Sequence, residues 1–353
     1  MVNFKKILVA LLLVAGCNAV SAHDFTVTLN GQKIYFNITS KYNRTAEVTY
    51  KGNIADNNYS DVKGVIEIPA KVKHDGVVYS VTNVSPKAFS NATELEGVIF
   101  PSGVKSIGDF AFEGCTSLRT VVFPGNKVTF GQGVFFKCTA ITDVTLGSDW
   151  DSVNFEMFRW SENLKVIAVP AKVEKISQLK SLKHLTAIYV DVNNKNFASV
   201  DGVLYSKDKR TLYGCPRAFA GKLAIADGTE TVTVGAFADC PGITSIDVPA
   251  SVVSLSFRET SRLNALQTVI FRGLTPMSTA FADGEGLLLL QVANPDVKIV
   301  VPKDSKKLYQ EALVQKQGEF REKDDVKSIP YMVRVDQMPK AKNLTGVKSF
   351  DKY

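Results

Sequence analysis

A repeat of 23 residues is the feature of this sequence that most constrains its fold. Four phenylalanines recur at this spacing, and a leucine or isoleucine follows each of them six residues later. These positions are Phe89, Phe112, Phe135 and Phe158, followed by Leu95, Leu118, Ile141 and Leu164. A similar frame returns at residues 229–249. One unit of this length cannot bury its own apolar edge, whereas stacked units can, so the period predicts a solenoid.

Each copy divides into a strand and a turn. In the second copy, Val121 and Phe123 alternate with Thr120 and Val122, which is the pattern of a short strand with one buried face. Pro124 then ends the strand, because proline has no N–H for the ladder. The other half of the copy, V-x-x-I-G-x-x-A-F, shows no alternation and predicts a turn followed by a short helical segment.

Three copies depart from this frame. The fourth brings in Trp150 and Trp160, the fifth is two residues shorter, and the seventh has lost its Ala-Phe pair but keeps Leu266 and Phe271 at the expected spacing. A stacking geometry requires the spacing more than the identity of each residue. We therefore expect these copies to stack like the others.

The complete frame, V-x-x-I-G-x-x-A-F-x-x-C-x-x-L-x-x-V-x-F-P, resembles the BspA-type leucine-rich repeats of bacteria. The resemblance implies a leucine-rich-repeat solenoid, α+β or β-rich, over residues 81–302, with a β-rich N-terminal cap at 23–80. It also implies a hairpin insertion at 197–216, turning at Asp201-Gly202, and a C-terminal cap and basic tail at 303–353. Within the N-terminal cap, Asn30-Gly31 is the favoured two-residue turn between alternating strands.

The same resemblance carries an expectation about function. Family members with an assigned role are similar to adhesion or host-protein-binding modules. It therefore implies a non-enzymatic protein that binds a protein ligand at the bacterial surface, for example a host matrix or cell-surface protein. It names no ligand, because repeats specify a surface and a few exposed side chains select the partner.

Residues 1–22 have the layout of a secretory signal, with Lys5 and Lys6, an apolar run and a small-residue exit. We expect an exported protein, either secreted or on the outer cell surface. Two exits remain open. Cleavage after Ala22 would leave His23 first, whereas the segment that ends at Cys17 resembles a lipoprotein signal and would leave Cys17 lipidated. The membrane attachment that we expect is limited to this lipid anchor.

The formal net charge of +7 does not indicate a nucleic-acid partner. Residues 298–353 hold 13 Lys and Arg against 8 Asp and Glu, so much of the surplus lies in the C-terminal tail. Nucleic-acid binding calls for a basic stripe with aromatic or glycine-rich partners. We interpret the tail as a solvated segment.

The chain lacks the residue patterns of common enzymes. Its histidines, His23, His74 and His184, lie far apart, and it contains no P-loop, G-x-G-x-x-G or HExxH motif. The cysteines after the leader form no CxxC pair, which argues against metal ligation. We expect no catalytic residue, cofactor or metal. An enzyme that uses Cys215 or scattered acids, such as Asp149 to Asp151 or Asp324-Asp325, is the third interpretation, after protein binding and carbohydrate binding.

Cys115 occupies a position that other copies fill with cysteine, alanine or serine. The equivalent residues are Ala92, Cys138, Ser161 and Cys240. A position that accepts these three types predicts a small buried slot rather than a nucleophile. Cys115 and Cys138 should lie about one strand spacing, ~5 Å, apart on adjacent coils. That separation is within disulfide range, and whether they are bridged stays open.

The candidate ligand contacts come from the side of the strands that faces away from the core. This strip is small, weakly charged and almost free of aromatic rings, which suits a protein surface better than a sugar. The candidates are Thr120, Val122, Asp143, Thr145, Tyr189 and Asp247 from the strip, together with Trp150 and Trp160.

The two tryptophans either fill an irregular coil or serve as exposed anchors. The alternative function is that of an accessory carbohydrate-binding surface protein that uses Tyr189, Trp150 and Trp160. Exposure of both tryptophans beside a groove would favour the sugar, and burial of both would favour the protein ligand.

Overall fold

A computed structural model of the chain describes residues 23–52, 62–237, 239–255, 263–276, 296–309 and 332–334. The expected signal segment, Cys17, Asp324-Asp325 and most of the basic tail lie outside these residues. The chain divides into two compact units, which are considered separately. The first comprises Met1–Leu118 and Val128–Cys138, and the second comprises Arg119–Lys127 and Thr139–Tyr353.

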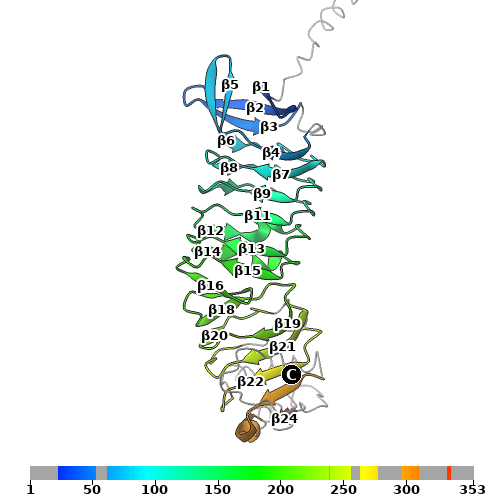
Figure 1. Cartoon of the computed structure of the whole chain (residues 1–353), viewed down its shortest axis with the longest axis vertical. Coiled ribbons are helices and arrows are strands. Elements are labelled where there is room, and N and C mark those ends of the chain that lie inside the picture. Colours follow the sequence, from blue (N-terminus) through cyan, green and yellow to red (C-terminus); the bar gives the residue numbers. More distant parts are fainter. Residues whose placement is uncertain are drawn as a thin grey trace, which may run out of the picture. The chain divides into compact units, whose positions relative to one another are not determined.

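The described residues of the first unit form nine strands, the first of which lie in the predicted N-terminal cap. Its strands are β1 (Phe25–Leu29), β2 (Gln32–Ser40), β3 (Thr45–Thr49), β4 (Gly64–Glu67), β5 (Lys71–His74), β6 (Val77–Val84), β7 (Leu95–Ile99), β8 (Ser106–Ile107) and β10 (Thr129–Phe130). One sheet has the order β1-β2-β3-β6-β8-β10, and its strands follow one another as layers (Figure 1). Strands β4 and β7 pair in parallel elsewhere in the unit.

The cap is continuous with the repeats because its last strand starts their parallel ladder. Strands β1, β2 and β3 are antiparallel, whereas β3 pairs in parallel with β6 and β6 with β8. The expected turn at Asn30-Gly31 is confirmed, with Leu29 opposite Gln32 and φ values of 49° and 79° at the two turn residues. These are the left-handed conformations that Asn and Gly tolerate.

Phenylalanine rings form the core of the first unit. Phe89 stacks on Phe112 with ring centroids 5.0 Å apart, and Phe112 stacks on Phe135 at 5.4 Å. All three are fully buried, as are Leu95 and Leu118. The 23-residue spacing therefore does what the sequence predicts, and places equivalent side chains in contact on adjacent coils.

The expected helical segment is wrong for these coils, which have turns in its place. The N–H of Ala111 donates to the carbonyl of Gly108 within the coil, but the next N–H, that of Phe112, donates to the carbonyl of Val134 on the next coil. A helix needs successive N–H groups to bond within one segment. Here alternate N–H groups join neighbouring coils, so the helix does not form.

The second unit contains further coils and three short 3-10 helices. Its elements are β9 (Thr120–Val122), β11 (Asp143–Thr145), β12 (Ser152–Asn154), η2 (Phe155–Phe158), β13 (Val166–Val169), β14 (Lys175–Ser177), η3 (Leu179–Ser181), β15 (Ala187–Val190), β16 (Phe197–Val200), β17 (Val203–Ser206), β18 (Thr211–Gly214), β19 (Ala220–Ala224), β20 (Thr231–Val232), β21 (Gly242–Val248), β22 (Thr268–Phe271), β23 (Lys298–Val301), η4 (Lys303–Ser305) and β24 (Met332–Arg334). These helices and the turn at residues 306–309 are the described helical structure of this unit.

The residues of the predicted hairpin insertion form a hairpin and a third strand. Strands β16 and β17 are antiparallel and turn at Asp201-Gly202, where φ is 50° and 79°. Strand β18 pairs antiparallel with β17 and in parallel with β20. The insertion is therefore joined to the following coil through its third strand.

The coils after the insertion have a continuous apolar core. Strands β19, β21, β22 and β23 pair in parallel, and β19, β21 and β22 lie in successive layers (Figure 1). Phe237, Ile246, Val269 and Phe271 are buried there, and the ring of Tyr309 packs 5.7 Å from that of Phe271. The seventh copy thus stacks as expected. The strand expected to close the array, β23, forms, but β24 pairs in parallel with it and extends the sheet further.

Candidate interaction surface

Four strands of the second unit, β9, β11, β13 and β15, have one more buried and one outward face, as the alternation predicts. In β9 and β11, Thr120 lies opposite Asp143 and Val122 lies opposite Thr145. Asp143 and Thr145 are exposed, Thr120 and Val122 are half-buried, and Val121 between them is fully buried. These four candidate contacts are therefore neighbours on one outward surface.

The next pair of strands carries an apolar patch on this face. Strands β13 and β15 pair in parallel, with Val166 opposite Ala187 and Ala168 opposite Tyr189. Val166 is 44% exposed and Tyr189 is 56% exposed. The side chain of Val166 is apolar, and that of Tyr189 has an apolar ring, so apolar surface faces outward here. We call these four residues the strand patch. Tyrosine combines a wide apolar ring with a polar end, which makes it frequent at protein interfaces.

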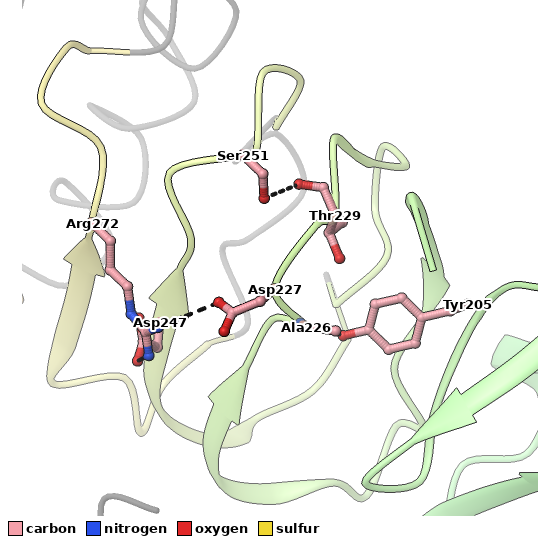
Figure 2. A network of polar contacts seen from close by, with 7 residues as sticks. All are labelled: Tyr205, Ala226, Asp227, Thr229, Asp247, Ser251 and Arg272. Carbon is pink, nitrogen blue, oxygen red and sulfur yellow. Dashed lines mark hydrogen bonds and ion pairs between the residues drawn. The ribbon is translucent and has the colours of Figure 1, made fainter. Parts of the chain in front are cut away.

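Asp247 is not available as an open ligand contact. Its residue exposure is 7%, because the guanidinium of Arg272 covers its carboxylate. Nε of Arg272 donates to Oδ1 of Asp247 at 2.8 Å, and Nη2 donates to Oδ2 at 2.6 Å. Figure 2 shows the two side chains face to face, with Asp227 nearby. The alternation of the sequence predicts that Asp247 points outward. It does not predict that Arg272, 25 residues further along the chain, covers its carboxylate.

This pair belongs to a polar network that joins several coils of the second unit. Nη1 of Arg272 lies 3.4 Å from Oδ1 of Asp227, and the hydrogen bonds that Arg272 donates to Asp247 raise the pKa of the arginine. Close by, the hydroxyl of Tyr205 accepts a hydrogen bond of 3.2 Å from the N–H of Ala226 (Figure 2). Burial raises the pKa of Tyr205 to about 12. Because these partners satisfy one another, we assign the network to the stability of the fold.

Trp150 is also too deeply buried to contact a ligand directly, because it is only 2% exposed. Its indole N–H donates to the carbonyl of Asn126 at 3.0 Å, and its ring packs 4.9 Å from that of Phe123. A buried indole whose N–H has found an acceptor is a packing element. This agrees with the interpretation of Trp150 as the filler of an irregular coil.

Trp160 differs from Trp150, since 41% of it is exposed. The guanidinium of Arg159 lies 5.9 Å from the centre of its ring, a cation–π distance. One tryptophan, Trp150, is therefore buried, and the other, Trp160, is exposed. Neither of the two outcomes that would have discriminated protein from sugar binding occurs.

The four cysteines in the described ranges are buried free thiols that lie in pairs. They are Cys115 with Cys138 in the first unit and Cys215 with Cys240 in the second. Burial, followed by the contact with the paired thiol, raises the pKa of both Cys115 and Cys215. A reactive cysteine needs the opposite shift, since the thiolate is the nucleophile. The structure therefore supports the buried-slot interpretation.

A hollow on the turn side of the second unit was not predicted from the sequence. It has a volume of about 270 Å³ and lies between η3, the end of β18 and the turn at residues 235–240. The residues that line it include the polar Lys180, Arg217 and Asp239, together with Leu179 and Tyr213. The detectable sequence signal is the absence of phenylalanine between Phe158 and Phe197, where the repeat would otherwise supply a ring.

The described residues hold neither a cluster of metal ligands nor a membrane-spanning helix. Within these ranges, no three His, Cys, Asp or Glu side chains are grouped so that they could hold a metal ion. No helix in the described part of the chain is both long and apolar enough to span a membrane.

Coils of about 23 residues, each with one short parallel strand and one turn, define a leucine-rich-repeat solenoid. Residues 77–198 match the model of the BspA type leucine rich repeat region, in six copies, and this segment belongs to that family.

Solved leucine-rich-repeat structures also match the chain. A leucine rich cell surface protein from Faecalibacterium prausnitzii is 20% identical, with 79% of this chain and 89% of that chain covered and a TM-score of 0.38. The pneumococcal vaccine antigen PcpA is 18% identical, with 83% and 97% covered and a TM-score of 0.41. A leucine-rich repeat protein from Bacteroides ovatus is 19% identical, with 73% and 75% covered and a TM-score of 0.44. No curated protein matches the chain.

Proposed function

We propose that this chain is an exported bacterial surface protein that binds a protein partner without catalysing a reaction. The observation that carries the proposal is the strand patch. Leucine-rich repeats are in general protein-interaction modules, and here the outward strand face holds Tyr189 and Val166 in an exposed position. Exposed apolar groups rimmed by polar residues are typical of protein-binding surfaces.

The surroundings of the patch support a protein ligand. Asp143 and Thr145 on β11 are exposed and polar, and β11 lies beside β13. A central tyrosine with an apolar neighbour and a polar rim matches the usual anatomy of a binding hot spot. The raised pKa values of Cys115 and Cys215 support a role without a thiol nucleophile.

Binding of the full-length chain to immobilised fibronectin, laminin, fibrinogen and collagen tests the partner class. We expect saturable binding to at least one of them, weakened about tenfold or more by Tyr189→Ala, because truncation of a hot-spot residue costs about 2 kcal/mol. Tyr42→Ala is the matched control, since Tyr42 is an exposed tyrosine of the first unit. Equal losses in both variants, or no binding at all, would reject the strand patch as the binding surface.

Export and attachment are part of the same proposal and rest on residues 1–22. Expression in a bacterial host, with labelling by a radioactive fatty acid, distinguishes the two exits. Incorporation of label that Cys17→Ser abolishes would show a lipoprotein. Release of an unlabelled chain beginning at His23 would show ordinary cleavage, and retention of both forms in the cytoplasm would contradict export.

A further inference from the structure

The hollow beside η3 has an origin in the repeat. The coil from residue 172 to 190 is shorter than its neighbours and has the short helix η3 and Leu179 where other coils place a buried phenylalanine. The hairpin insertion follows it, and its last strand supplies Tyr213 at the edge of the hollow. The space is therefore the result of one missing ring and one inserted strand within the second unit.

Arg217 supplies the main hydrogen-bond donors of this hollow. Its side chain is 22% exposed, and its described hydrogen bond joins Nη1 to the carbonyl oxygen of Lys180 at 3.2 Å. A guanidinium has five N–H donors in a fixed plane. Most of these donors have no described protein acceptor, although most of the side chain is removed from water. Such a group is ready to donate to a ligand in the hollow.

Asp239 supplies an acceptor next to these donors. Oδ1 of Asp239 lies 3.9 Å from Nη2 of Arg217, which is within an ion pair but too long for a direct hydrogen bond. The two groups thus present a donor and an acceptor side by side. Neighbouring hydroxyls of a sugar ring can bind both groups at once, because each hydroxyl donates one hydrogen bond and accepts others, and a carboxylate accepts several hydrogen bonds.

The apolar walls fit the remaining surface of a sugar ring. Tyr213 is 42% exposed and its ring is held edge-to-face against Phe197, with centroids 5.8 Å apart. A supported, half-exposed ring offers a flat surface for the C–H face of a pyranose. Leu179 closes the hollow on another side. The volume of about 270 Å³ is just below the range of pockets for drug-sized ligands, so it has room for a single ring.

We propose that this hollow binds one hexose residue of a glycan, with Arg217 and Asp239 on two adjacent hydroxyls and Tyr213 against the ring face. A carboxylate or phosphate ligand fits less well, because Asp239 would repel it from the position beside Arg217. This site is separate from the strand patch and from Trp150 and Trp160. It involves other residues, so its failure would leave the proposed protein-binding surface unaffected.

Saturation-transfer NMR with the full-length chain tests this proposal. The probes are the methyl glycosides of glucose, galactose, mannose and N-acetylglucosamine, with sorbitol as an acyclic polyol control. We expect millimolar binding of at least one glycoside and none of sorbitol. Arg217→Gln and Tyr213→Leu should each weaken it about tenfold or more, since each removes a charged donor or the stacking surface.

Arg210→Gln is the matched control. Arg210 is an exposed arginine of the same insertion that pairs with Glu230 at 3.6 Å and does not line the hollow. It should bind the glycoside like the unchanged chain, and circular dichroism must show that all variants fold. Asp239→Asn preserves the shape of the site and should also weaken binding, which provides a second variant should Arg217→Gln unfold.

Three outcomes would overturn the proposal. They are no saturable binding of any glycoside, equal binding by Arg217→Gln and the unchanged chain, and displacement of the glycoside by an acidic peptide whose own binding requires Arg217. The last result would assign the hollow to a protein ligand. If the chain binds a glycoside but shows no protein binding that depends on Tyr189, the result would reject the strand patch and leave the glycan site standing.

Discussion

Gly147 lies directly against the indole of Trp150. A Cβ added at Gly147 would be 2.3 Å from Nε1 of Trp150 and 2.2 Å from the carbonyl oxygen of Pro124. Other copies have proline at this position, including Pro101 and Pro170. The third copy therefore departs from the frame because the buried tryptophan occupies the space that a side chain at residue 147 would need.

We predict that Gly147→Ala lowers the free energy of unfolding by about 1–3 kcal/mol, the usual cost of overpacking a core. Urea denaturation followed by circular dichroism measures this change. In the Trp150→Ala background the penalty should become smaller without disappearing, because the contact with Pro124 remains. An unchanged denaturation midpoint in Gly147→Ala would contradict the close packing of these residues.

The two tryptophans should differ sharply in their contribution to stability. Trp150→Ala removes a buried ring and leaves a cavity, so we expect a loss of about 3–5 kcal/mol. Trp160→Ala changes a partly exposed side chain and should stay within about 0.5 kcal/mol of the unchanged chain. Thermal and urea unfolding of both variants provides the comparison. Similar losses in the two would show that the packing of Trp150 is not special.

The pair of Asp247 and Arg272 should be more important for stability than the contact of Arg272 with Asp227. We expect Asp247→Ala to lower the free energy of unfolding by about 2 kcal/mol, since it removes a bidentate charged hydrogen bond from a partly buried guanidinium. Asp227 is exposed, so Asp227→Ala should cost less than about 1 kcal/mol. Urea unfolding at low and high salt tests both values, and a reversed order would refute the assignment.

Alkaline solution should destabilise the second unit through Tyr205. Burial raises the pKa of its phenol to about 12 in the folded chain, while an unfolded tyrosine has a pKa of about 10. The folded state therefore retains a proton that the unfolded state loses. Stability that is complete below pH 10 should decline as the pH rises toward 12.

Tyr205→Phe tests this dependence, because it removes the ionisable hydroxyl. The variant should lose less stability between pH 10 and pH 12 than the unchanged chain does, and its absorbance change at 295 nm above pH 11 should be smaller. Tyr309, whose pKa burial also raises to about 12, accounts for the part that remains. A loss of absorbance change near pH 10 in the variant, with none above pH 11, would show that Tyr205 ionises at an ordinary pH.

Periodic features were accessible from the sequence because they depend on spacing alone. Phe89 and Phe112 had to meet if coils stack every 23 residues, and Asn30-Gly31 and Asp201-Gly202 had to turn because few other pairs tolerate two positive φ angles. The outward direction of Tyr189 followed from the alternation of β15. Each of these inferences uses one local rule.

Features that depend on contacts between unlike coils were not accessible. Burial of Asp247 requires Arg272, which directly follows the next strand, β22, and nothing in either segment indicates that the two side chains meet. The hollow requires the short coil at η3, the inserted strand β18 and Arg217 together. The helical segment was mispredicted because the bonding of Phe112 to the next coil is also non-local.

The alternation of N–H bonds within and between coils has a mechanical consequence. Where the backbone of a coil is bonded only to the coils directly before and after it, a force that pulls on the chain acts first on the hydrogen bonds of the outermost coil. Extension should release the chain one coil at a time, in steps of roughly 8 nm for 23 residues at full stretch. A surface protein built in this way would lengthen gradually under shear, keeping its inner coils folded while its outer ones unwind.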